Sequence, residues 1–208
     1  FFRKRINSSI RIERVWDCVD QSIFRVLNES SPVDTNYLMT FGRISKSALH
    51  KGYFELIDVF ANIKKRFSSI KLVFAGDGDL KNDLIEYSKK LEVFDSVIFT
   101  GFITDKEAVR YLNHATLFCL ISKLGHQSGE GIPLTPLEAL SCGTPILVGN
   151  QDGSRECIQD NVGFAVDPNN LKLIEEKITF FLEMDSLTSE EIKSNCINTA
   201  NKFFSYQR

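Results

Sequence analysis

The sequence predicts an α/β fold in which a doubly wound, mostly parallel sheet carries helices on both faces. Six short apolar runs have the length and composition of buried parallel strands, at residues 37–41, 71–75, 97–100, 117–121, 145–148 and 163–166. Longer segments with helical periodicity separate these runs. Strands alternating with helices indicate βαβ units, and their right-handed crossovers place helices on both sides of the sheet.

The segments between the strands carry the signals of helix ends. Helices are expected at residues 52–67, 81–91, 105–113, 135–142, 171–183 and 189–203. Thr104 with Glu107 three positions later has the pattern of a capping box. Pro136 and Gly143 fit the first turn and the C-terminal end of the fourth helix. Thr188 is expected to cap the last one.

Composition and charge narrow the class of protein. A hydrophobic fraction of 43% and a charged fraction of 25% are typical of a globular domain. The net charge of -2 gives no reason to expect nucleic acid as a partner. The five cysteines lack metal-type spacing, which favours reduced thiols and a cytoplasmic location. No apolar run is long enough to cross a membrane.

A basic cluster near the start of the sequence leaves two interpretations open. It is either a solvated terminal segment or a peripheral contact with the anionic inner face of a membrane. The cluster consists of Arg3, Lys4, Arg5, Arg11 and Arg14.

Ligands of an open α/β sheet bind at the carboxyl ends of its strands, so the loops there are the candidate sites. Gly42 and Arg43 follow the first predicted strand, and Lys51 stands just before the next helix. An arginine can bind a diphosphate through two parallel hydrogen bonds, while a lysine near a helix N-terminus adds a point charge. The alternative is that both are ordinary surface cations.

Glycines follow the next two predicted strands. Gly76 stands after the second and Gly101 after the third, where a missing side chain allows a tight turn or a close approach to a ligand. Phe102 comes next. A plain turn at each strand end explains these glycines equally well.

The most informative loop follows the fourth predicted strand, where residues 129–144 read GEGIPLTPLEALSCGT. Glu130 falls in a loop and Glu138 in the first turns of the following helix. The backbone N–H groups of Leu134 and Thr135 are expected to point out of the helix N-terminus, which attracts phosphate. Carboxylates beside it are good acceptors for sugar hydroxyls. The alternatives are a solvated loop charge for Glu130 and helix-dipole stabilisation for Glu138.

Six segments together resemble the C-terminal domain of the retaining glycosyltransferases of family 4, which have the GT-B fold. In order they are YLMTFGRIS, KGYFELIDVF, KLVFAGDGDL, VIFTGF, EGIPLTPLEALSCGTPILV and GFAVDP. Glu130 and Glu138 match the family's E-x7-E motif. Upstream, the segment WDCVDQSIF at residues 16–24 is similar to the stretch that leads into that domain. The resemblance implies a Rossmann-like, nucleotide-sugar-binding half of the enzyme.

The resemblance also implies roles for single residues. Arg43 and Lys51 would bind the donor diphosphate and stabilise charge on the leaving group, and Glu130 would contact the transferred sugar; these three are the catalytic candidates. Glu138 would hold the ribose, while Gly101 and Phe102 would lie near the base. The full donor-binding set is Gly42, Arg43, Lys51, Gly76, Gly101, Phe102, Glu130, Leu134, Thr135 and Glu138. No metal and no cofactor are expected.

The same resemblance suggests how the chain is organised. Residues 1–36 are expected to be an opening segment and linker, 37–186 the donor-binding domain, and 187–208 a helix that begins the return to an N-terminal domain. That domain would precede Phe1 and bind a glycan or lipid-linked acceptor, so this chain alone is expected to transfer hexose inefficiently. The expected setting is surface polysaccharide or glycoconjugate synthesis.

The sequence leaves two other function classes to consider. A nucleotide-binding or interaction module of the same fold, without transfer activity, is the main alternative. A dinucleotide-dependent oxidoreductase needs Gly-x-Gly-x-x-Gly after the first strand, and the Gly42-Arg43-Ile44 turn does not fit that pattern.

Overall fold

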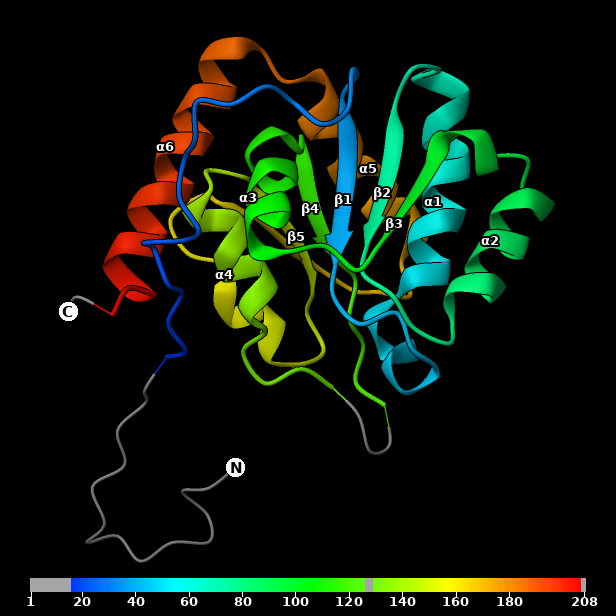
Figure 1. Cartoon of the computed structure of the whole chain (residues 1–208), viewed down its shortest axis with the longest axis horizontal. Helices are drawn as coiled ribbons and strands as arrows, with labels where there is room; N and C mark the ends of the chain where they lie inside the picture. The colour runs from blue at the N-terminus through cyan, green and yellow to red at the C-terminus, as the bar shows by residue number, and fades with distance from the viewer. Residues whose placement is uncertain (1–15, 126–128, 207–208) are drawn as a thin grey trace, which may run out of the picture.

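The computed structural model describes residues 16–125 and 129–206 and confirms the predicted fold class. One parallel sheet of six strands runs through its centre in the order β3-β2-β1-β4-β5-β6 (Figure 1). The strands are β1 (Tyr37–Phe41), β2 (Lys71–Ala75), β3 (Val97–Gly101), β4 (Leu117–Leu120), β5 (Ile146–Gly149) and β6 (Gly163–Val166).

Two layers of helices cover the two faces of the sheet. They comprise α1 (Tyr53–Arg66), α2 (Lys81–Lys90), α3 (Asp105–His114), α4 (Leu134–Ser141), α5 (Leu171–Glu183) and α6 (Ser186–Phe203). Alternate strand residues face opposite layers, since successive side chains of a strand point to opposite sides. Tyr37 and Met39 pack with α3, α4 and α6, whereas Leu38 packs with α1, α2 and α5. The fold is therefore doubly wound, as predicted.

Most predicted element boundaries hold to within one residue, and two differences have clear causes. Helix α6 begins at Ser186, because the carboxylate of Asp185 accepts the N–H of Thr188 at 2.8 Å and caps the helix. The prediction that Thr188 is the cap is therefore wrong. Strand β5 begins after Pro145, which has no N–H to donate to a ladder. The capping box of Thr104 is confirmed.

Three short 3-10 helices were not predicted: η2 (Lys46–Lys51), η3 (Phe94–Ser96) and η4 (Gly153–Cys157). They are too short to show an apolar period. Helices η2 and η4 follow β1 and β5, so both stand near the carboxyl edge of the sheet where the candidate residues gather.

Residues 16–36 run beside α6 and cross to the start of β1 (Figure 1). Val19, Phe24 and Val33 are buried in the same core cluster as α3, α4 and α6. The N–H of Val19 also donates to the carbonyl of Phe204 at 2.8 Å. This stretch therefore packs on the sheet domain. The division of the chain at residues 36 and 186 stays a prediction.

The basic cluster of the first 15 residues lies outside the described residues. Within the described part of the chain, no helix combines the length and apolar character needed to span a membrane.

Candidate functional site

The candidate site lies at the carboxyl edge of the sheet, where its winding direction changes. From β1 the chain builds outward to β2 and β3, and β4 then starts on the other side of β1. The loops after β1 and β4 therefore leave the sheet in opposite directions. Such a switch point is where open α/β sheets bind their ligands.

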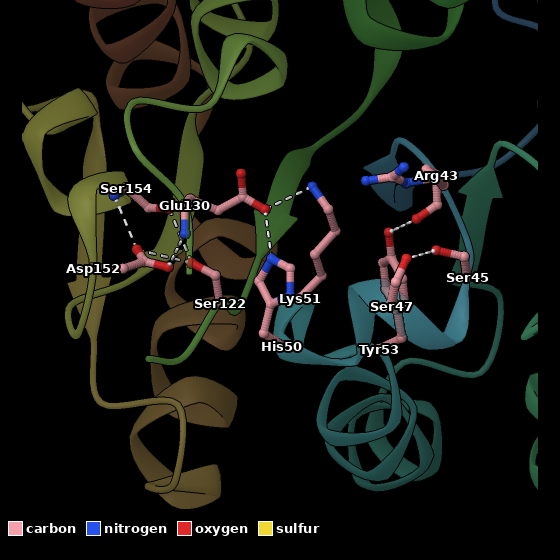
Figure 2. Close-up of polar contacts among 10 residues, drawn as sticks. All are labelled: Arg43, Ser45, Ser47, His50, Lys51, Tyr53, Ser122, Glu130, Asp152 and Ser154. Atoms are coloured by element: carbon pink, nitrogen blue, oxygen red, sulfur yellow. Dashed lines mark hydrogen bonds and ion pairs between the residues drawn. The ribbon is translucent and has the colours of Figure 1, made fainter. Parts of the chain in front are cut away.

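A compact cluster of Lys51, Glu130 and His50 joins these two loops (Figure 2). The ammonium nitrogen of Lys51 lies 2.8 Å from Oε1 of Glu130, and Nε2 of His50 lies 3.0 Å from the same oxygen. The three side chains are only 14%, 17% and 13% exposed, respectively. The structure thus brings together two predicted residues that are distant in the sequence, and it adds a histidine.

The charge of Glu130 is set by two opposing effects. Burial raises the pKa of this carboxyl, but the hydrogen bond and positive charge of Lys51, together with the hydrogen bond of His50, outweigh it. The net pKa of Glu130 is lowered from its ordinary value. Glu130 is therefore a carboxylate at neutral pH, able to accept hydrogen bonds from a ligand.

The backbone of the Glu130 loop is held by Asp152 (Figure 2). Oδ2 of Asp152 accepts the backbone N–H of Glu130 at 3.0 Å, while Oδ1 accepts the Ser122 hydroxyl at 3.1 Å and the Ser154 N–H at 3.0 Å. The carbonyl of Glu130 in turn accepts the N–H of Gly153 at 3.0 Å. One carboxylate thus ties the loop before α4 to the end of β4 and to η4.

Arg43 lies beside this cluster but contacts none of its members through an observed hydrogen bond or ion pair. Its carbonyl accepts the Tyr53 hydroxyl at 2.9 Å, and its guanidinium is exposed (Figure 2). Lys51 stands over the adjacent Gly42, because a β-carbon built there would lie 3.9 Å from its ammonium. The two predicted cations therefore border one region, where Lys51 is paired with Glu130 and Arg43 makes no ion pair with the cluster.

A groove of about 560 Å³ opens beside Arg43. Residues from the loops after β1, β2 and β3 line it: Phe41, Gly42, Arg43, Gly76, Asp77, Phe102, Ile103, Thr104 and Asp105. The groove therefore gathers four predicted donor-binding residues and is large enough for part of a nucleotide.

Gly76 allows the close packing of two of these loops. Its φ is +131°, and a β-carbon there would lie 1.9 Å from the carbonyl oxygen of Gly42. The N–H of Gly76 donates to the carbonyl of Gly101 at 2.9 Å. Phe102, the residue after Gly101, is 84% exposed and lies on the wall of the groove. An exposed ring in a groove is available for stacking against a flat ligand.

The N-terminus of α4 supplies the other predicted group. Leu134 and Thr135 are its first two residues, so their N–H groups precede the first helical hydrogen bonds. Oε2 of Glu138 and Oγ1 of Thr135 are buried without a hydrogen-bond partner among the described residues. Burial, reinforced by the charge of Asp105, raises the pKa of Glu138 to about 7. These orphaned oxygens suit a ligand that brings hydroxyl donors.

Sequence reasoning missed His50 and Asp152. His50 shows no ligand spacing in the sequence, and its partner Glu130 is 80 positions away. The position of His50 next to Lys51 was the available signal. Asp152 lies in a turn-rich stretch after β5, and only the folded structure shows that this stretch reaches the Glu130 loop.

Within residues 16–125 and 129–206, no group of three histidine, cysteine, aspartate or glutamate side chains is arranged to hold a metal ion.

Together the fold and the edge cluster define a Rossmann-like α/β domain with its polar site at the strand carboxyl ends. A family model for glycosyl transferases group 1 matches residues 27–203, and the chain belongs to this family. The resemblance to family 4 is thereby confirmed at the level of family and fold.

Relatives and solved structures agree with this family. Alpha-monoglucosyldiacylglycerol synthase of Streptococcus pneumoniae is 35% identical over 119 residues, which are 57% of this chain and 26% of that protein. A 4-alpha-N-acetylgalactosaminyltransferase of Campylobacter jejuni, which acts on a diphospho-undecaprenol-linked sugar by its name, is 25% identical over 180 residues, 85% of this chain and 46% of that one. The chain thus spans less than half the length of these relatives.

Among solved structures, Anabaena Alr3699/HepE in complex with UDP and glucose superposes with a TM-score of 0.76. The identity is 21%, over 92% of this chain and 52% of that one. This likeness establishes the Rossmann-like α/β fold that the chain shares with GT-B glycosyltransferases.

Proposed function

We propose that this chain is the donor-binding domain of a retaining glycosyltransferase that moves a hexose from a nucleotide-diphosphate sugar to a glycan or lipid-linked acceptor. The observation that carries the proposal is the Lys51–Glu130 pair at the switch point, with Arg43 on one side and the N-terminus of α4 on the other. A diphosphate joined to two sugars requires cations and an oriented helix terminus for its phosphates and carboxylates for its sugar hydroxyls.

The cations serve the diphosphate. As the bond between the sugar and the diphosphate breaks, negative charge builds on the departing phosphate. Arg43 and Lys51, aided by the N–H groups of Leu134 and Thr135, stabilise that charge. Because these groups neutralise the diphosphate, transfer proceeds without a metal ion or other cofactor.

The two glutamates serve the two sugars. Lys51 and His50 both bind Oε1 of Glu130, and within the described residues Oε2 makes no hydrogen bond or ion pair. Oε2 accepts a hydroxyl of the transferred hexose. The orphaned Oε2 of Glu138 accepts a ribose hydroxyl, which supplies the donor that this buried oxygen lacks. The base lies against Gly101 and Phe102, beside Gly42 and Gly76.

The rest of the proposed enzyme lies beyond this chain's donor site. An N-terminal domain binds the acceptor, and the donor domain alone transfers sugar inefficiently. The enzyme works in the cytoplasm, at or near the inner face of the membrane, in surface polysaccharide or glycoconjugate synthesis. Two relatives support this setting, one named as a synthase of monoglucosyldiacylglycerol and the other as a transferase that acts on a diphospho-undecaprenol-linked sugar.

The test is calorimetric titration of the chain with UDP, GDP and ADP, followed by their sugar conjugates, with and without EDTA. The expected result is binding of one nucleotide class, insensitive to EDTA and weakened by roughly tenfold or more in Arg43→Ala and Glu138→Ala. Arg66→Ala is the matched control, since Arg66 pairs with Glu183 at the exposed end of α1. Equal binding by all variants would contradict the assignment of the site.

A further inference from the structure

We propose that His50 is a positioning residue that fixes the carboxylate of Glu130, so that Oε2 faces the transferred sugar. This inference rests on the proposed function for the role of Glu130 and goes beyond it for the role of His50. It makes the histidine a determinant of how tightly the sugar, rather than the nucleotide, is held.

The first argument is the arrangement of donors on one oxygen. Nε2 of His50 and Nζ of Lys51 approach Oε1 of Glu130 at 3.0 Å and 2.8 Å (Figure 2). A lysine alone would orient the Glu130 carboxylate poorly, because its ammonium lies at the end of a long flexible side chain. An imidazole has only two side-chain torsions and a fixed plane. Two donors on Oε1 therefore stop the carboxylate from pivoting and leave Oε2 in one direction.

The second argument is the tautomer. A carboxylate only accepts hydrogen bonds, so Nε2 of His50 must carry the hydrogen. Nδ1 is buried without a hydrogen-bond partner among the described residues. Placing the hydrogen on Nδ1 instead would bury an unpaired N–H and set a lone pair against the Glu130 carboxylate. The surroundings thus select the form of His50 that holds Glu130.

The third argument is that the ring is anchored at its backbone. The carbonyl of His50 accepts the N–H of Lys123 at 2.8 Å, which ties η2 to the chain just after β4. The next glycine, Gly52, packs so tightly that a β-carbon there would lie 2.1 Å from the carbonyl oxygen of Ile121. His50 is therefore fixed to the strand whose following loop carries Glu130.

The binding test compares His50→Leu, His50→Gln and, as a control, His114→Leu. A glutamine amide can place an N–H near the position of Nε2, and His114 lies at the end of α3, where it meets the carbonyl of Glu29. Each protein is titrated with the nucleotide diphosphate that the wild type binds and with its sugar conjugate. We expect His50→Leu to lose roughly tenfold in affinity for the conjugate while its affinity for the diphosphate stays unchanged. His50→Gln restores most of the loss, and His114→Leu binds as the wild type does.

Other outcomes separate the explanations. Equal losses for the diphosphate and the conjugate would show that His50 only supports the fold, and no loss for either would overturn the inference while leaving the proposed function intact. If the wild type binds no nucleotide, the proposed function fails. Nitrogen-15 NMR of the histidines tests the geometry without any ligand: a His50 Nε2 that carries no hydrogen in the wild type would overturn the inference.

Discussion

Replacing Lys51 by methionine tests the electrostatics of the site most sharply. The substitution keeps the length of the side chain and removes its charge, so Glu130, only 17% exposed, keeps His50 as its remaining observed donor. At 2.8 Å and an effective dielectric constant of about 20, the lost attraction is about 6 kcal/mol, and the desolvation of both groups in the wild type offsets part of it. We expect the free energy of unfolding to fall by about 3 kcal/mol at pH 7, or roughly 6–12 °C in Tm.

The pH dependence gives this prediction a second test. The wild-type pKa of Glu130 is lowered, so its contribution is fully present above the unfolded pKa and is lost as pH falls through the folded pKa. In Lys51→Met the pKa of Glu130 rises, because burial then lacks its main opposing charge. The loss of stability should therefore shrink as the pH is lowered from 7 to about 4, where the unfolded carboxyl takes up protons.

The assay is urea unfolding at both pH values, with Lys46→Met as the matched control. Lys46 belongs to the same 3-10 helix, but its pair with Asp83 spans 3.6 Å and both side chains are more than half exposed. That control should lose less than about 1 kcal/mol. Adding Glu130→Gln to Lys51→Met should recover much of the loss. A Lys51→Met loss no larger than the control, or one independent of pH, would refute the reasoning.

Two further substitutions probe other parts of the site. The pKa of Glu138 is raised to about 7, so the wild type should lose stability as the pH rises from about 4.5 to 7. In urea unfolding at pH 8, Glu138→Gln should therefore be more stable than the wild type by up to about 3 kcal/mol. A stability difference that does not change with pH would contradict the burial of this carboxyl. Gly76→Ala should cost about 2 kcal/mol or more, because its β-carbon would overlap the carbonyl of Gly42, whereas a β-carbon at Gly131 meets nothing within 4 Å. Equal melting temperatures for Gly76→Ala and Gly131→Ala would show that the loops can move apart.

The sequence predicted the sheet and the main helices because they follow from apolar periodicity. Strands β1, β2 and β6 and helix α5 have their predicted limits. The start of α6 was misplaced because two capping residues, Asp185 and Thr188, compete in the sequence and only the backbone geometry selects between them. Apolar periodicity along the sequence therefore predicts most of the helices and strands. Errors arise where two neighbouring residues could each cap the same helix.

The candidate site was predicted in part, and the missing part is three-dimensional. Spacing along the chain singled out Lys51 and Glu130, and the parallel topology made their meeting at one edge expected. His50, in the loop after β1, contacts the Glu130 carboxylate, and Asp152, in the loop after β5, accepts the Glu130 backbone N–H. Their role depends on the unpredicted helices η2 and η4, which carry no periodic signal.

A crystal structure of the chain with the nucleotide diphosphate identified by titration tests the central claim most directly. The account predicts the diphosphate between Arg43, Lys51 and the N-terminus of α4, with a ribose hydroxyl on Oε2 of Glu138 and the base beside Phe102. A nucleotide bound away from these residues, or a diphosphate that contacts neither cation, would contradict it.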